Sequence, residues 1–90
     1  MSNHQAYKIT KGIPWQVLDE AVIILSPANR MAHELDETGS FVWLEISKNQ
    51  TIDQISRRLT EEFDVDMVTA QKDTLSFICA LEGKNLVERV

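Results

Sequence analysis

The spacing of apolar residues changes near residue 35, and this change divides the chain into two halves. Before it, three short runs rich in Val, Ile, Leu and Trp occupy residues 14–18, 21–25 and 30–35, with polar or Pro/Asn breaks between them. Runs of this composition and spacing are typical of strands joined by tight turns. We therefore predict a three-stranded antiparallel meander within residues 13–35.

The strands of this meander should differ in how they are covered. The middle run is apolar at every position from Ala21 to Leu25, which favours a central strand covered on both faces. The third run alternates between larger and smaller or polar residues, the pattern of a half-buried strand. Because a three-stranded meander has two exposed edges whose free backbone groups can template another strand, residues 30–35 are a candidate for such pairing.

From Asp36 onward the apolar residues recur at helical spacing. Asp36, Thr51 and Asp66 are each placed to cap the first turn of a helix, and Gln54 completes a capping box with Thr51. These caps predict helices near 36–47, 51–63 and 67–84. Asparagine follows the first helix at position 49 and the third at position 85, where the left-handed conformation that ends helices is needed.

The third predicted helix carries two apolar stripes. The stripe expected to meet the core has four members: Ala70, Thr74, Phe77 and Leu81. The other stripe lies on a different side of the helix and has three members: Val68, Leu75 and Cys79. Two stripes fit either two buried contacts inside the domain or one internal face and one wall of a groove, and both alternatives stay open.

Composition places the chain among small soluble globular domains. Its 90 residues suit a single domain spanning 1–90, in which we expect residues 1–12 to be flexible. No apolar stretch reaches the length of a membrane span, and residues 1–13 lack the apolar core of a signal peptide. With one cysteine, Cys79, an internal disulfide is excluded. We expect a cytoplasmic protein that does not associate with membranes.

The ionisable residues do not form a catalytic arrangement. Acidic residues outnumber basic ones by 14 to 9, and residues 36–90 hold the whole excess, with 11 acidic and 6 basic residues. His4, His33 and Cys79 show no spacing typical of a metal site or a nucleophile with its base. A packed or rim histidine and a small apolar cysteine are the simpler interpretations. We expect no enzymatic activity and no cofactor or metal.

Several short motifs in the helical half resemble those of a known family. They comprise Leu35, Asp36, Thr38, Gly39, Trp43, Ile46, Thr51, Ile52, Ile55, Phe63, Asp64, Val65, Asp66, Asp73, Phe77, Ile78, Leu81, Leu86 and Val87. Their order and spacing resemble the PqqD family over about residues 13–90. Lys48-Asn49 stands where the family often has Asp-Gly, and Asn85 where it usually has Gly. Because Asn tolerates left-handed geometry, the fold expectation is unchanged.

The resemblance implies an α+β, winged-helix-like fold with a three-stranded antiparallel sheet (about 13–35) followed by a three-helix bundle (about 36–84). It also implies recognition of the leader of a ribosomally made precursor peptide. The leader would then be presented to a radical SAM enzyme or another peptide-modifying enzyme, as in pyrroloquinoline quinone biosynthesis. In the family the leader adds as a strand beside the third strand, against the third helix.

The peptide-binding residues expected from this are Arg30, Met31, Ala32, His33, Glu34, Leu35, Val68, Gln71, Lys72, Leu75 and Cys79. The exposed sheet edges also allow a homodimer. The alternative function is that of a winged-helix DNA-binding regulator, whose recognition helix should be basic. The third helix instead balances Lys72 and Lys84 against Asp73 and Glu82, so we expect no nucleic-acid partner.

Overall fold

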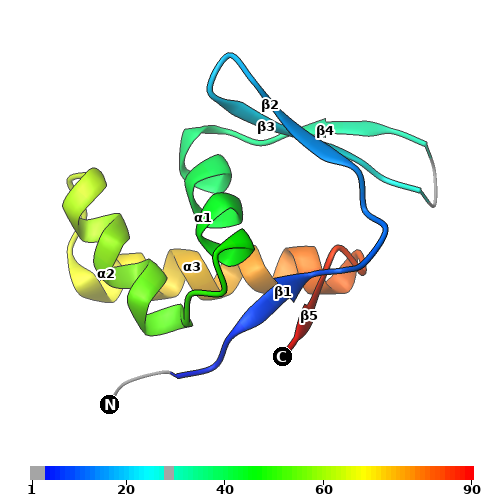
Figure 1. Cartoon of the computed structure of the whole chain (residues 1–90). Coiled ribbons are helices and arrows are strands. Elements are labelled where there is room, and N and C mark those ends of the chain that lie inside the picture. The colour runs from blue at the N-terminus through cyan, green and yellow to red at the C-terminus, as the bar shows by residue number, and fades with distance from the viewer. Residues whose placement is uncertain (1–3, 28–29) are drawn as a thin grey trace.

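The computed structural model describes residues 4–27 and 30–90. Its elements, in order, are β1 (Tyr7–Ile9), β2 (Trp15–Leu18), β3 (Ala21–Leu25), β4 (Ala32–Glu34), α1 (Glu37–Ser47), α2 (Ile52–Glu62), α3 (Met67–Gly83) and β5 (Val87–Arg89). The predicted α+β architecture, a three-stranded antiparallel sheet followed by three helices, is confirmed. The sheet of β2, β3 and β4 lies at one end of the molecule, above the helices (Figure 1).

A two-residue turn joins β2 to β3. Asp19 and Glu20 both have positive φ, 52° and 68°, as the hairpin turn whose twist matches paired strands requires. The sheet order β2-β3-β4 makes β3 central, as predicted. The prediction that β3 is covered on both faces is wrong, because Val22 and Ile24 are fully buried whereas Leu25 is 44% exposed. Helices cover only one face of this sheet (Figure 1).

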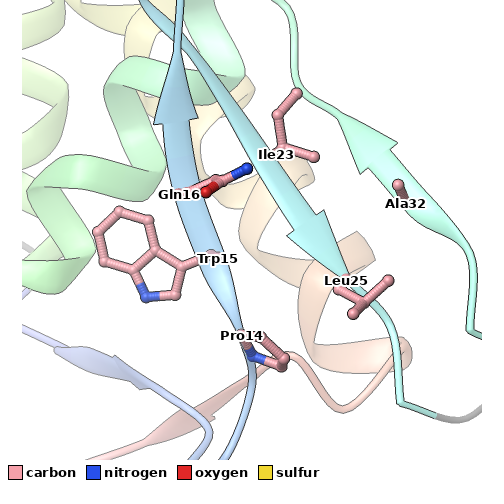
Figure 2. A pocket seen from close by; sticks show the side chains of 6 residues that line it. All are labelled: Pro14, Trp15, Gln16, Ile23, Leu25 and Ala32. Carbon is pink, nitrogen blue, oxygen red and sulfur yellow. The ribbon is translucent and has the colours of Figure 1, made fainter.

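The uncovered side of the sheet carries a cavity of about 370 Å³. Its lining residues are Pro14, Trp15, Gln16, Ile23, Leu25 and Ala32 (Figure 2). Trp15 extends toward α1 and packs edge-on against Trp43, with 5.9 Å between the ring centroids. Trp43 is fully buried in the centre of α1, so the two tryptophans join the sheet to the helices.

The three predicted helix caps are confirmed. Asp36 accepts a 2.7 Å hydrogen bond from the Gly39 amide, and Thr51 forms the capping box with Gln54. Asp66 accepts a 2.7 Å hydrogen bond from the Thr69 amide, which lowers the pKa of its carboxyl group. Asparagines 49 and 85 adopt φ of 62° and 59°, the left-handed conformation expected after α1 and α3.

Ser40 ties α1 to the sheet. Its hydroxyl accepts a 2.9 Å hydrogen bond from the Val22 amide on β3 and donates to the Leu35 carbonyl at 3.2 Å. Ser40 is 3% exposed, so both bonds are shielded from water. Because this hydroxyl satisfies two backbone groups at the junction of β4 with α1, it fixes the direction in which the chain leaves the sheet.

The N-terminal segment differs from the expectation that residues 1–12 are flexible. Residues 1–3 lie outside the described residues, but residues 7–9 form β1, which pairs antiparallel with β5. Tyr7 is 5% exposed and belongs to the core. The Ile52 amide donates to the Gln5 carbonyl at 2.9 Å, which also ties this segment to the start of α2.

Candidate functional site

The free edge of β4 exposes unpaired backbone groups. The Leu35 amide donates to the Val22 carbonyl at 2.9 Å, and the Ser26 amide donates to the Met31 carbonyl at 2.9 Å, so backbone groups of residues 31 and 35 face β3. These groups alternate in direction along a strand, so those of Ala32 and Glu34 point to the opposite side. Since β4 is the last strand of its sheet, those groups face outward.

A cavity of about 460 Å³ lies where the chain passes from β4 to α1. Its lining residues are Asp36, Thr38, Gly39, Val42, Asp73, Ser76, Phe77 and Ala80. α1 and α3 supply an apolar floor from Val42, Phe77 and Ala80, while hydroxyls and carboxylates form the rim. An apolar side chain of a bound peptide would find a pocket here, next to a strand edge that can pair with its main chain.

Gly39 sets the close approach of α1 to α3 at this cavity. A Cβ atom on residue 39 would lie 3.0 Å from the Asp36 Oδ1 atom and 3.1 Å from the Phe77 Cε1 atom. Any side chain at this position would displace the Asp36 cap or the Phe77 ring by a few tenths of an ångström, so glycine permits the closest approach of the two helices. The glycine of the Leu-Asp-x-Thr-Gly motif shapes the site through packing and supplies no chemistry of its own.

The strand residues predicted to bind peptide lie at the free edge. Met31 is 58% exposed, Ala32 and Glu34 are exposed, and His33 and Leu35 are half-buried. Arg30 is exposed and has a φ of 57°. The predicted half-buried alternation is thus confirmed for residues 32–35, whereas Met31 is more exposed than the alternation implied.

The helix residues predicted to bind peptide are solvent-accessible but do not line this cavity. Val68, Lys72, Leu75 and Cys79 are exposed and Gln71 is half-buried, so the Val68–Leu75–Cys79 stripe is not core. At 100° per residue, the stripe lies about 110° around α3 from the side that bears Asp73, Ser76 and Ala80. The structure therefore does not bring this stripe together with the cavity beside β4.

The side of α3 that bears Cys79 and Glu82 instead lies near Arg89 of β5. The pKa of Arg89 on β5 is raised by a hydrogen bond with Tyr7, and further by the nearby groups of Tyr7, Glu82 and Cys79.

The predicted core stripe of α3 needs one correction, because Ile78 is 1% exposed whereas Phe77 is half-buried and lines the cavity. Periodicity places the core side of a helix, but it cannot tell which flank meets a given strand.

The cavity residues absent from the predicted set are Asp36, Thr38, Gly39, Val42, Asp73, Ser76, Phe77 and Ala80. For part of this set a signal was present in the sequence. Asp73 and Phe77 are four residues apart in the family-like motif Asp-x-x-x-Phe-Ile, and such a spacing puts both on one side of a helix. Thr38 and Gly39 belong to the motif that precedes α1.

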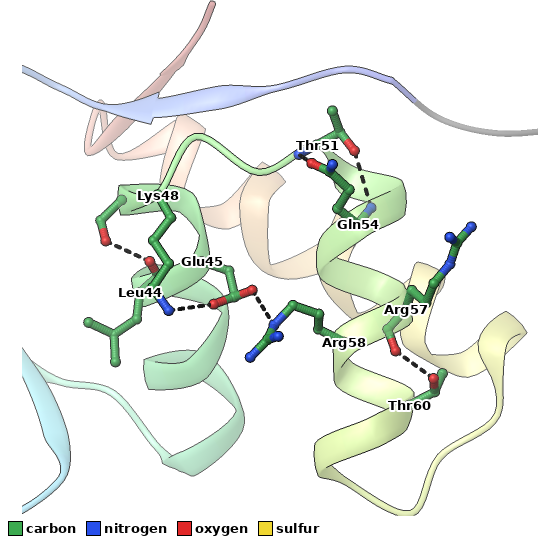
Figure 3. Close-up of polar contacts among 9 residues, drawn as sticks. Leu44, Glu45, Lys48, Thr51, Gln54, Arg57, Arg58 and Thr60 are labelled. Carbon is green, nitrogen blue, oxygen red and sulfur yellow. Dashed lines mark hydrogen bonds and ion pairs between the residues drawn. The ribbon is translucent and has the colours of Figure 1, made fainter.

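The one basic doublet of the chain is occupied by ion pairs. Arg57 contacts the Asp53 carboxylate at 3.1 Å (Nη2 to Oδ2). Arg58 Nε lies 2.6 Å from Glu45 Oε1, an ion pair without hydrogen-bond geometry, and Lys48 contacts the other carboxylate oxygen at 3.1 Å (Figure 3). Glu45 is 2% exposed, so these contacts join α1 to α2. Neither arginine is an unpaired cation for phosphate contacts.

Residues 4–27 and 30–90 lack two further classes of site. No group of three or more His, Cys, Asp or Glu side chains there is arranged to hold a metal ion. No helix in this part of the chain is long and apolar enough to cross a membrane.

Three solved structures share this fold. TbiB1 in complex with the TbiA(beta) leader peptide is 27% identical, with a TM-score of 0.83 over 90% of this chain and 94% of that chain. A lasso peptide synthetase B1 complexed with the leader peptide is 15% identical, with a TM-score of 0.82 over 91% and 96%. The PqqD truncation of Methylobacterium extorquens PqqCD, a stand-alone RiPP recognition element, is 21% identical, with a TM-score of 0.74 over 92% and 88%.

The amino-acid sequence matches one protein family. No curated protein shows a significant sequence match to this chain. The family model described as coenzyme PQQ synthesis protein D (PqqD) matches residues 21–87, which include the whole of β3, β4 and the three helices. The resemblance seen in the short motifs is thus confirmed over most of the chain, and this protein belongs to the PqqD family.

Proposed function

We propose that this protein binds the leader of a ribosomally made precursor peptide and presents it, without catalysis, to an enzyme that modifies the peptide. The observation that carries this proposal is the free β4 edge, followed two residues later along the chain by a cavity between α1 and α3 that begins at Asp36. An added strand gains main-chain hydrogen bonds that depend little on sequence, and pockets for alternate side chains supply the specificity. The similarity to TbiB1, whose structure contains a leader peptide, supports the same function.

In this proposal the leader pairs with the outward backbone groups of Ala32 and Glu34. Arg30 to Leu35 form the strand side of the site, as the sequence predicted. On the helix side, the cavity favours Asp73, Ser76, Phe77 and Ala80 over the predicted set Val68, Gln71, Lys72, Leu75 and Cys79. An apolar leader side chain would contact Phe77 and Ala80.

Family membership also suggests which class of enzyme receives the precursor. We propose a radical SAM enzyme that receives the leader-bound precursor, as in pyrroloquinoline quinone biosynthesis. The likeness to TbiB1 supports leader binding without favouring that pathway, so other peptide-modifying enzymes are the competing partners. Purification of this protein with a radical SAM enzyme and a precursor peptide from its own genome tests the choice, and failure to form a ternary complex would contradict it.

Two neighbouring residues on α3 give a sharp test of the binding site. Ala80 lines the cavity and Cys79 lies on the other flank, and both are exposed. Ala80→Asp places a charge against the apolar floor, so it should weaken binding of a labelled cognate precursor by at least about tenfold, since burying an unpaired charge is unfavourable. Cys79→Asp, the matched control, should leave the affinity within about twofold of wild type, since an exposed charge stays solvated.

Amide shifts in the same titration should include residues 32 and 34. The opposite pattern, with Cys79→Asp harmful and Ala80→Asp harmless, would move the site to the Val68–Leu75–Cys79 stripe. Shifts confined to α1 and α2 would exclude both sites. Circular dichroism of each variant checks that the fold is retained.

A further inference from the structure

The sheet has a second open edge, on β2. The Leu25 amide donates to the Pro14 carbonyl at 3.0 Å, and Gln16 lies opposite Ile23 in the register. Even-numbered residues of β2 therefore direct their backbone groups to β3, whereas those of Trp15 and Val17 point outward. β2 is the other terminal strand of the sheet, so this edge can also accept an added strand.

A groove of about 500 Å³ adjoins this edge. Its lining residues are Val17, Glu20, Glu37, Ser40, Phe41, Leu44, Glu62 and Phe63, and we call it the β2 groove. It shares no lining residue with the cavity between α1 and α3, and Phe41 and Leu44 are about 110° around α1 from Thr38 and Val42. The two sites can therefore be occupied at the same time.

The floor of the β2 groove is apolar. Phe41 and Phe63 pack edge-to-face with 5.6 Å between their ring centroids, and Leu44 lies beside them in the lining. Val17 on β2 is 49% exposed. A strand added to this edge would direct alternate side chains onto this floor, because side chains alternate between the two faces of a strand.

The rim of the β2 groove is acidic. Glu20, Glu37 and Glu62 are exposed, and none of them forms an ion pair with another described residue. Arg58 lies 5.8 Å above the Phe41 ring, and it is already paired with Glu45 at 2.6 Å. No described cation therefore pairs with the three rim carboxylates, and their combined field favours a cationic ligand.

We propose that the β2 groove docks an extended basic segment of the peptide-modifying enzyme, in which Lys or Arg alternates with apolar residues. This assignment of the occupant rests on the proposed function. The apolar residues would cover Phe41 and Phe63, and the cations would face the rim carboxylates, which favours rapid and specific encounter. A second copy of this chain is a poorer occupant, because its net charge is −5. The leader and the enzyme would then occupy opposite edges of one small sheet.

The first test uses a fluorescein-labelled heptapeptide of alternating Lys and Val as the probe, with a Glu/Val heptapeptide as its counterpart. The Lys/Val peptide should bind the full chain and shift the amides of Val17, Phe41 and Phe63. Glu62→Lys should weaken it by at least about tenfold, because a like charge would then face the probe. Glu61→Lys makes the same charge change on an exposed neighbour outside the lining, so its effect should stay within about threefold.

Three outcomes would overturn the proposal. They are equal binding of the Glu/Val peptide, shifts at Ala32 and Glu34 in place of Val17, and equal losses in the Glu61 and Glu62 variants. The cognate precursor should bind Glu62→Lys as tightly as wild type, and Ala80→Asp should still bind the probe, so failure at one site is distinguished from failure at the other. Finally, the modifying enzyme should displace the probe from the wild-type protein, and no displacement would refute the assigned occupant.

Discussion

Gly39 and Gly83 are both helical, but they differ in what surrounds them. Gly39→Ala would push a methyl group against Asp36 and Phe77, whereas Gly83 has no atom within 4 Å of its added Cβ. Overpacking costs about 1–3 kcal/mol and exceeds the helix-propensity gain of about 0.5–1 kcal/mol, so Gly39→Ala should destabilise the fold by about 1 kcal/mol. Gly83→Ala should stabilise it by up to about 1 kcal/mol. Urea unfolding measures both, and equal signs would contradict the packing around Gly39.

Asp66 makes stability depend on pH. Because the Thr69 amide lowers the pKa of this carboxyl group in the folded state, its stabilising contribution is present above the ordinary value of 3.8 and is lost as pH falls through the lowered value. Asp66→Asn keeps a capping oxygen but removes the charge. Its melting temperature should lie below that of wild type at pH 7, and the difference should shrink below pH 4. A difference that is constant from pH 7 to 2.5 would exclude this linkage.

At the scale of elements, α2 and α3 each contribute a large apolar side chain, and the two are buried to different extents. Leu59 is 1% exposed, so Leu59→Ala should lower the free energy of unfolding by about 2–5 kcal/mol. Phe77 is half-buried and borders the cavity, so Phe77→Ala should cost less than the about 3–5 kcal/mol typical of buried Phe, and it should also weaken precursor binding. If Phe77→Ala lowered the free energy of unfolding more than Leu59→Ala does, Phe77 would be a core residue, contrary to this prediction.

Local sequence signals predicted the helices and strands well, but they do not say how these elements are placed relative to one another. The caps at Asp36, Thr51 and Asp66 involve residues three positions apart, so the sequence alone determines them. Which flank of α3 lines the cavity depends on how the helix is placed in the tertiary structure, and the apolar pattern of its 17 residues contains no such information. For this reason the residues predicted on α3 do not include the cavity-lining Ser76 and Ala80, and the strand half of the site stays a prediction.

At the scale of the whole molecule, β1 closes the fold by pairing with β5. Removal of residues 1–10 would delete buried Tyr7 and its pairing with β5, so it should destabilise the protein by at least about 3–5 kcal/mol, as loss of a buried aromatic residue does. Lys8→Ala is the control, because its 3.5 Å ion pair with Glu88 is half exposed and should contribute less than about 1 kcal/mol. Full stability of the truncated chain in urea would show that β1 is dispensable.

The pairing of β1 with β5 could not be predicted from local pattern. Each strand has three residues, and nearly the whole chain separates them. Neither has room for the alternation that marks a strand, and the entropy of closing so long a loop is offset only by packing that the other elements provide. The expectation that residues 1–12 are flexible arose because β1 carries no such local pattern.

The same pairing has a topological consequence. Because Tyr7 lies opposite Arg89 in an antiparallel register, the chain enters and leaves the domain side by side. β1 and β5 also form a separate two-stranded sheet, apart from the sheet whose β2 and β4 edges are open (Figure 1). A domain with adjacent ends can be carried within a surface loop of a larger polypeptide with little distortion of its host. This architecture is therefore suited to genetic fusion and circular permutation, with both open edges still facing solvent.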